Sequence, residues 1–209
     1  LHISFLTEQG SVRAVDGVSF DLEPGKSIGI VGESGSGKSV SSLSMMRLVE
    51  FGGGKLTNGT LKFTRKSGET LDITKSDQSL MRTIRGNEIG MIFQEPMTAL
   101  NPLFTVAQQL TEGLRTHKGL GKEAATNRAL ELLYLVRIPE PERRLNQYPH
   151  ELSGGMRQRV VIAMALACEP RLLIADEPTT ALDVTIQAEI LALIDRLKRE
   201  TGTAVMFIT

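Results

Sequence analysis

The sequence predicts an α/β protein with a mainly parallel sheet, an antiparallel β part at its N-terminal end and a helical insertion. Three observations predict this class. Short apolar runs, typical of buried strands, alternate with segments of helical periodicity. A glycine-rich loop, residues 32–39 (GESGSGKS), joins one such run to a helical segment. The apolar run 171–176 ends in two adjacent carboxylates, as expected at the ligand-binding edge of a parallel sheet.

Composition excludes several classes of protein. The 209 residues carry 24 Lys and Arg against 24 Asp and Glu, a formal charge of zero that argues against a strongly cationic nucleic-acid binder but leaves local basic patches open. No apolar run is long enough to span a bilayer. The single cysteine, Cys168, excludes a disulfide within the chain and favours a reducing compartment. Because the chain starts at Leu1 and stops at Thr209 inside an apolar run, we expect both ends to be cut.

The sequence pattern of the first part of the chain predicts β-strands. Residues 1–6 and 12–22 alternate apolar and polar side chains, which indicates a hairpin, and residues 27–31 (SIGIV) read as a buried strand. Residues 40–49 follow with helical periodicity. Beyond the glycines at 52–54, the signals are weak as far as Arg85, with a short strand expected at 61–63.

The loop at residues 32–39 fits the pattern GxxxxGK[ST] and has the required strand before it and helix after it. Glycines let the backbone aim its N–H groups inward, and the helix N-terminus adds partial positive charge. Lys38 would bridge terminal phosphates, and Ser39 would ligate Mg²⁺. The alternative is a plain connecting loop. The predicted phosphate-binding residues are Gly32, Glu33, Ser34, Gly35, Ser36, Gly37, Lys38, Ser39 and Val40.

The middle of the chain contains a short strand and then a helical insertion. Residues 89–93 (IGMIF) form the strand, and Pro96 must end it, so Gln94 is held at a strand end. Its amide can coordinate Mg²⁺ or position water, although such a glutamine is often only a solvated loop residue. Residues 105–136 show helical spacing.

Two further motifs follow. Ser153, Gly154 and Gly155 precede a long helical run and form a second candidate anion site, with an ordinary serine N-cap as the favoured alternative for this motif taken alone. At the end of the strand 171–176, Asp176 would hold Mg²⁺ through water, and Glu177 would polarise the attacking water. A solvated acidic turn is the alternative. A helix at 185–201 and a strand at 204–208 complete the pattern.

Five motifs, GESGSGKS, IFQEP, LSGGM, LLIADE and TALD, occur in an order that resembles the ATP-binding subunit of ABC transporters over essentially the whole chain. They are similar to the Walker A, Q-loop, signature, Walker B and D-loop motifs. The strings FQEPMTALNP and YPHELSGGMRQR look most like importers of dipeptides, oligopeptides and glutathione. The resemblance implies one ABC nucleotide-binding domain, with residues 1–94 and 160–209 as the core and β part and 95–159 as a helical subdomain.

By the same resemblance, the cofactors are ATP and Mg²⁺. Phe5 falls where an aromatic stacks on adenine, although core packing explains it equally well, and Asp183 belongs to the D-loop. The signature Ser153, Gly154 and Gly155 would close on a nucleotide held by a second ATP-binding subunit, identical or different. The other implied partners are transmembrane permease subunits at the cytoplasmic face of the cell membrane and, indirectly, an extracytoplasmic solute-binding protein, with no nucleic acid.

Two details qualify the resemblance. The family's switch histidine follows the strand at which this chain stops, and none of the three histidines occupies that position. Four apolar residues would line the docking groove for the membrane subunits, or belong to the core: Met97, Leu100, Leu103 and Phe104.

We therefore expect an ATPase that powers peptide-class import, with catalytic Glu177, Lys38 and Gln94 and metal ligands Ser39, Gln94 and Asp176. A rival function is an ABC-type ATPase of DNA repair or chromosome maintenance. The lack of a long heptad segment and the zero charge count against it. A nucleotide-binding module without turnover is a third hypothesis, against which Glu177 beside Asp176 argues.

Overall fold

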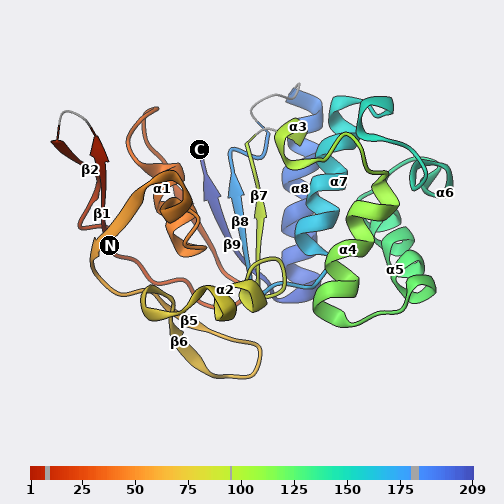
Figure 1. Cartoon of the computed structure of the whole chain (residues 1–209). Helices are drawn as coiled ribbons and strands as arrows, with labels where there is room; N and C mark the ends of the chain where they lie inside the picture. Colours follow the sequence, from red (N-terminus) through yellow and green to blue (C-terminus); the bar gives the residue numbers. More distant parts are fainter. Residues whose placement is uncertain (8–9, 95, 180–183) are drawn as a thin grey trace.

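The structure is a computed structural model that describes residues 1–7, 10–94, 96–179 and 184–209. Its centre is a parallel sheet in the order β3 (Ser27–Ile30), β9 (Ala204–Ile208), β8 (Leu172–Asp176) and β7 (Ile89–Ile92). Figure 1 shows α1 (Lys38–Met45) on one side of this sheet and α7 (Gly154–Leu166) with α8 (Val184–Thr201) on the other. The predicted α/β class is confirmed.

The parallel strands are apolar because both faces of the sheet are covered. Every residue of β7 is buried, and in β8 only Leu172 is partly exposed. On α8, Ile190, Leu193, Ile194 and Leu197 recur at helical spacing and are all buried. The strands expected at 27–31, 89–93, 171–176 and 204–208 are therefore present within one residue of the predicted bounds.

A second, antiparallel sheet in the order β2 (Gly10–Asp16), β1 (His2–Thr7) and β4 (Gly54–Asn58) forms the N-terminal β part. It encloses a small core of Ile3, Val15 and Val49, and Val49 begins the 3-10 turn Val49–Gly52. Gly54 has to be glycine, because an added Cβ would lie 2.5 Å from Val49 Cγ2 and 2.9 Å from the ring of Phe5.

The strand expected over residues 12–22 is too long by six residues, because β2 ends at Asp16. Gly17 has a φ of 76°, and the N–H groups of Gly17 and Val18 both donate to the carbonyl oxygen of Leu1. The chain thus turns away from the sheet. Phe20 and Leu22 keep their alternation since both pack against the core cluster under the parallel sheet. Here alternation indicates side-chain packing rather than strand pairing.

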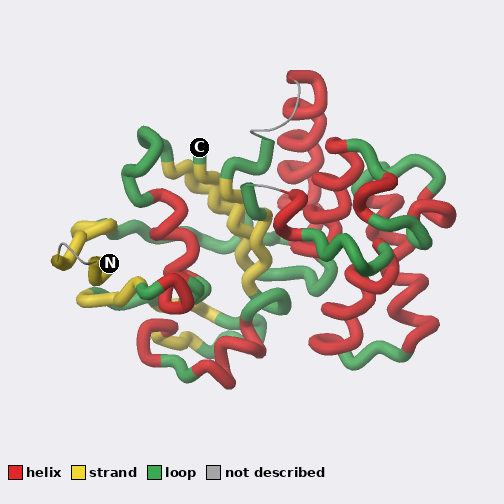
Figure 2. Tube along the Cα trace, turned by 45° about the horizontal axis from the view of Figure 1, so that its top comes forward, coloured by secondary structure: helices red, strands yellow, loops and turns green. Residues whose placement is uncertain are grey.

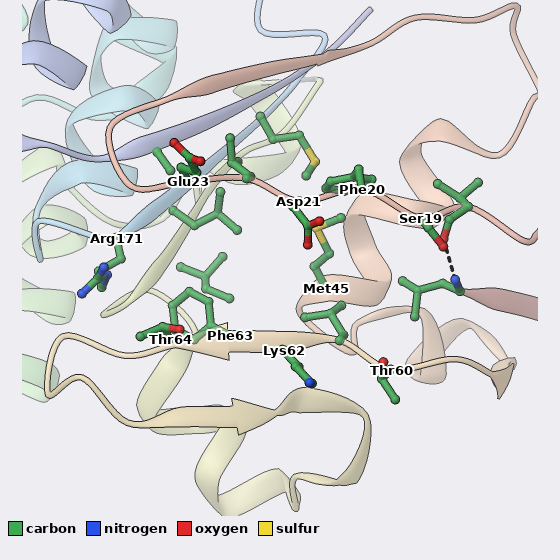
Figure 3. A pocket seen from close by; sticks show the side chains of 18 of the residues that line it. Ser19, Phe20, Asp21, Glu23, Met45, Thr60, Lys62, Phe63, Thr64 and Arg171 are labelled. Atoms are coloured by element: carbon green, nitrogen blue, oxygen red, sulfur yellow. Dashed lines mark hydrogen bonds between the residues drawn. The ribbon is translucent and has the colours of Figure 1, made fainter.

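Between β4 and β7 the chain folds into elements for which the sequence had only weak signals. These are β5 (Lys62–Thr64), β6 (Thr70–Asp72), a 3-10 turn (Ile73–Lys75) and α2 (Gln78–Ile84). The buried carboxylate of Glu88 accepts from Arg65 Nε at 2.7 Å and from the Lys66 N–H at 2.9 Å, which ties the β5–β6 hairpin to the base of β7. A cavity of about 790 Å³ separates the segment 18–24 from β5 (Figure 3).

The helical insertion consists of α3 (Pro96–Ala99), α4 (Val106–Lys118), α5 (Lys122–Leu135), α6 (Pro141–Arg144) and the 3-10 turn Pro149–Glu151, followed by α7. These helices gather beside the sheet in the cartoon of Figure 1, and the tube of Figure 2 shows the same group of helices beside the strands. The helical region expected at 105–136 is two helices, because Gly119, with a φ of 65°, ends α4.

The helical insertion and the parallel sheet share one hydrophobic core. One continuous apolar core joins α4, α5 and α7 to α8 and to β7 and β8. The expected boundary between residues 159 and 160 falls inside α7, so the division into subdomains stays a prediction. In the described part of the chain, none of the helices has the length and apolarity needed to cross a membrane.

Candidate nucleotide-binding site

The glycine-rich loop starts at the end of β3 and is anchored to the end of the neighbouring strand. Gly32 N–H donates to the carbonyl oxygen of Thr209 at 3.3 Å, and Thr209 N–H donates to that of Ile30 at 3.1 Å. The loop ends at Gly37, the N-cap of α1, where no side-chain hydrogen bond from the described residues caps the helix. The first amides of α1 are therefore available to an anionic ligand.

Glycine is required at the helix end of this loop. Gly37 has a φ of 90°, and a Cβ there would lie 2.3 Å from the carbonyl oxygen of Ala14. Ala14 is skipped in the β1–β2 register, where Ile3 pairs with Val15 and Ser4 with Arg13. This bulge brings a backbone carbonyl of the antiparallel sheet against the start of α1. Sequence reasoning missed this contact, since nothing local to Ala14 indicates a bulge.

Lys38 and Ser39 extend from the first turn of α1 toward two different partners. Lys38 Nζ donates to the carbonyl oxygens of Gly32 at 2.6 Å and Glu33 at 3.0 Å, so the ammonium group lies across the loop. Ser39 Oγ donates to Asp176 Oδ1 at 3.2 Å, which joins the loop to the end of β8. The structure thus brings together residues that lie 137 positions apart in the sequence, as predicted.

Asp176 is 5% exposed. Burial raises the pKa of its carboxyl above the ordinary value, the negative charge of Glu177 raises it further, and the Ser39 hydroxyl and Lys38 act in the opposite direction. A buried carboxylate with a raised pKa is poorly compensated by its surroundings, which is the condition that a cation would relieve.

Glu177 and Gln94 meet above the ends of two adjacent strands. Gln94 comes shortly after β7, and Glu177 comes directly after β8. Gln94 Nε2 donates to Glu177 Oε2 at 2.8 Å. Glu177 has a φ of 45°, in the left-handed region, and its N–H donates to the carbonyl oxygen of Ile208 at 3.0 Å. A non-glycine residue there costs about 1–3 kcal/mol and persists where surrounding contacts hold it, most often at functional sites.

Other predicted site residues do not lie in this cluster. Ser153 caps α7 by accepting from the Met156 N–H at 3.3 Å, with Gly154 and Gly155 as the first residues of the helix. Since α7 and α1 lie on opposite sides of the parallel sheet (Figure 1), the two predicted anion sites are separated within one chain. Asp183 lies outside the described residues.

Phe5 and Val40 have roles in packing as well. Both side chains are partly buried and pack against the small core of the antiparallel sheet. The expected stacking of Phe5 on adenine stays a prediction. Of the apolar residues expected at a docking groove, Leu100 is 3% exposed and belongs to the core, whereas Leu103 is 78% and Phe104 46% exposed. The side chain of Met97 lies outside the described set.

The donor set suits magnesium better than a transition metal. The described residues contain no group of three or more His, Cys, Asp and Glu side chains that could hold a metal. What the loop region offers is one carboxylate, one hydroxyl and one amide, from Asp176, Ser39 and Gln94. Mg²⁺ prefers oxygen ligands and is usually held by one or two carboxylates together with phosphates of the substrate.

Comparison with known proteins decides the family. Residues 15–180 match the family described as ABC transporter. The chain belongs to the ABC transporter family. It is 56% identical over 209 residues to the oligopeptide transport ATP-binding protein OppD of Bacillus subtilis, covering 100% of this chain and 57% of that protein. It is 55% identical over 210 residues to the glutathione import ATP-binding protein GsiA of Pectobacterium atrosepticum, covering 100% of this chain and 34% of that protein.

A solved structure agrees with the ABC family fold. An ATP-binding cassette, in a dimeric post-hydrolysis state bound to ADP and phosphate, superimposes with a TM-score of 0.82 at 31% identity, covering 100% of this chain and 84% of that one. The prediction of an ABC-type P-loop core with an antiparallel β part and a helical insertion is confirmed. The chain thus spans 34% of the length of this glutathione import protein and 57% of the length of this oligopeptide transport protein.

Proposed function

We propose that the protein is a Mg²⁺-dependent ATPase that powers the import of peptides or glutathione-like solutes through a membrane ABC transporter. The observation that carries the proposal is the contact of Ser39 with Asp176, beside the Glu177–Gln94 pair. It gathers a phosphate loop, a magnesium ligand set and a general base at one edge of the parallel sheet.

Different residues of the chain bind the phosphates, hold the cation and activate the water. The loop 32–40 binds the phosphates through backbone N–H groups, and Lys38 exchanges its two backbone acceptors for the terminal phosphates. Ser39, Asp176 and Gln94 would hold the cation, and a bound Mg²⁺ would supply positive charge to the phosphate oxygens. Glu177 orients and polarises the attacking water, while Gln94 keeps its carboxylate in place.

A second copy or a related chain completes the site. The signature end of α7 and the loop before α1 lie on opposite sides of the sheet, so Ser153 serves the nucleotide held by a partner. The dimeric cassette bound to ADP and phosphate supports this proposal by likeness. The names of the relatives, oligopeptide transport and glutathione import, support the import class and hence permease subunits and a solute-binding protein as partners. Association with the cytoplasmic face of the membrane follows from those partners.

The test is phosphate release by the purified protein with ATP. We expect turnover in Mg²⁺ and its loss in excess EDTA. Ser39→Ala should lose Mg²⁺-dependent turnover, whereas Ser44→Ala, which removes a hydroxyl from the same helix that donates only to Val40, should keep it. Equal turnover by both variants, with and without Mg²⁺, would contradict the proposal.

The transport half of the proposal has its own test. Permease subunits should co-purify with the tagged protein from membranes. The protein should show none of the salt-dependent DNA binding that is typical of a DNA-repair protein. DNA binding without membrane partners would favour the DNA-repair class instead.

A further inference from the structure

Gln158 is a buried polar side chain that the proposed function leaves unused. It is 1% exposed and lies on the second turn of α7. Its Nε2 donates a 2.6 Å hydrogen bond to the carbonyl oxygen of Pro178, the residue directly after Glu177. Its Oε1 has no hydrogen-bond partner within the described ranges.

The position is an unfavourable one for an amide. Burying an amide oxygen without a partner costs free energy, and an apolar side chain of the same length would fill the space without that cost. What an apolar side chain cannot do is donate to a carbonyl. Gln158 therefore contributes a hydrogen bond of fixed direction, which holds the backbone oxygen of the residue next to Glu177.

The backbone at Glu177 depends on such contacts. The left-handed conformation of Glu177, with a φ of 45°, persists only if neighbouring bonds hold it. On the side of the sheet, the Glu177 N–H is bonded to the carbonyl oxygen of Ile208. On the side of α7, Gln158 holds the carbonyl oxygen of the next residue, Pro178. One residue further on, Gln187 Nε2 of α8 donates to the carbonyl oxygen of Thr179 at 3.1 Å.

We propose that Gln158 is a positioning residue that couples the N-terminal end of α7 to the carboxylate of Glu177, an inference that rests on the proposed function. Gln158 and Ser153 lie on the same helix, so they move together when that end of α7 is displaced. The displacement reaches the Pro178 carbonyl through the amide, and then the backbone and carboxylate direction of Glu177. When Ser153 contacts the nucleotide that is bound to the partner, that nucleotide would in this way influence the carboxylate of Glu177 in this chain.

The first experiment compares Gln158→Met with Gln187→Met. Methionine keeps the length of glutamine and removes the donor, so Gln158→Met loses the bond to the Pro178 carbonyl and Gln187→Met loses the bond to the Thr179 carbonyl. We expect Gln158→Met to lower kcat for ATP about tenfold, as expected for one lost hydrogen bond that orients a catalytic group, while KM for ATP stays within about twofold. Gln187→Met should stay within about twofold of wild type in both.

The second measurement does not depend on turnover. Without nucleotide, the amide proton of Glu177 should exchange faster with solvent by at least about tenfold in Gln158→Met, measured by NMR, and stay near wild type in Gln187→Met. Circular dichroism and thermal unfolding of both variants verify that the fold is intact.

The outcomes separate the two proposals. A wild-type protein without ATP turnover contradicts the proposed function, while the exchange rate of Glu177 still decides the inference. An unchanged exchange rate of Glu177 in Gln158→Met overturns the inference, as does a kcat equal to that of active wild type. Equal losses in both glutamine variants also overturn it, because the loop would then need anchoring in general rather than through α7.

Discussion

Replacing Gly37 with alanine is the sharpest test of how the phosphate loop is built. The left-handed backbone at Gly37 costs a residue with a side chain about 1–2 kcal/mol. The new Cβ would also lie 2.3 Å from the carbonyl oxygen of Ala14. Because the Cβ is fixed rigidly to the loop backbone and the oxygen belongs to the backbone of β2, the loop or β2 must shift by about 1 Å, and such overpacking costs about 1–3 kcal/mol. The sum is about 2–5 kcal/mol.

Gly35→Ala is the matched control. Gly35 lies in the same loop with a φ of 81°, but a Cβ there would meet none of the described atoms within 4 Å. It should therefore show only the backbone cost of about 1–2 kcal/mol. The difference between the two variants isolates the contact between the loop and the bulge of β2.

Urea unfolding followed by circular dichroism measures both free energies, with equal m values as the check for two-state comparison. Binding of a fluorescent ATP analogue shows whether the displaced loop also loses affinity, which we expect for Gly37→Ala. The reasoning is refuted if the two alanine variants unfold at the same urea concentration and bind the analogue equally.

Three further predictions concern single side chains. Lys38→Ala should lower ATP affinity and turnover with an unchanged circular dichroism spectrum, and unaltered binding would remove Lys38 from the site. Glu177→Gln should bind ATP but release no phosphate, and should accumulate as an ATP-bound dimer in size-exclusion chromatography; turnover at the wild-type rate would show that Glu177 is not the base. Glu88→Gln should lower the free energy of unfolding by about 2 kcal/mol in urea, because its neutral amide removes the charge opposite Arg65 and keeps only one oxygen to accept from both Arg65 Nε and the Lys66 N–H; a loss below about 1 kcal/mol would contradict this.

Much of the fold and the centre of the site followed from local signals. The loop 32–39 is a contiguous motif with its strand and helix attached, and the buried strands are continuous apolar runs, so short windows of sequence contain all that is needed to recognise them. The meeting of Ser39 with Asp176 was predictable because the carboxyl ends of parallel strands share one edge.

The missed features depend on contacts between distant segments. The end of β2 at Asp16 follows from hydrogen bonds to Leu1, and the close approach of Gly37 to Ala14 follows from a bulge in strand pairing. Neither leaves a local pattern, because alternation in residues 18–22 arises equally from packing against a core without a strand partner.

The sequence by itself therefore determined the class of fold and the family, and it predicted a set of nucleotide-binding residues, because each of these rests on contiguous motifs. Only the tertiary structure decided that Glu177 adopts a left-handed backbone, with its N–H bonded to β9 and the following carbonyl, of Pro178, bonded to α7. It also decided that the two candidate anion sites lie on opposite sides of one sheet. The physical reason is that backbone strain and the relative placement of helices are set by long-range packing, which has no periodicity along the chain.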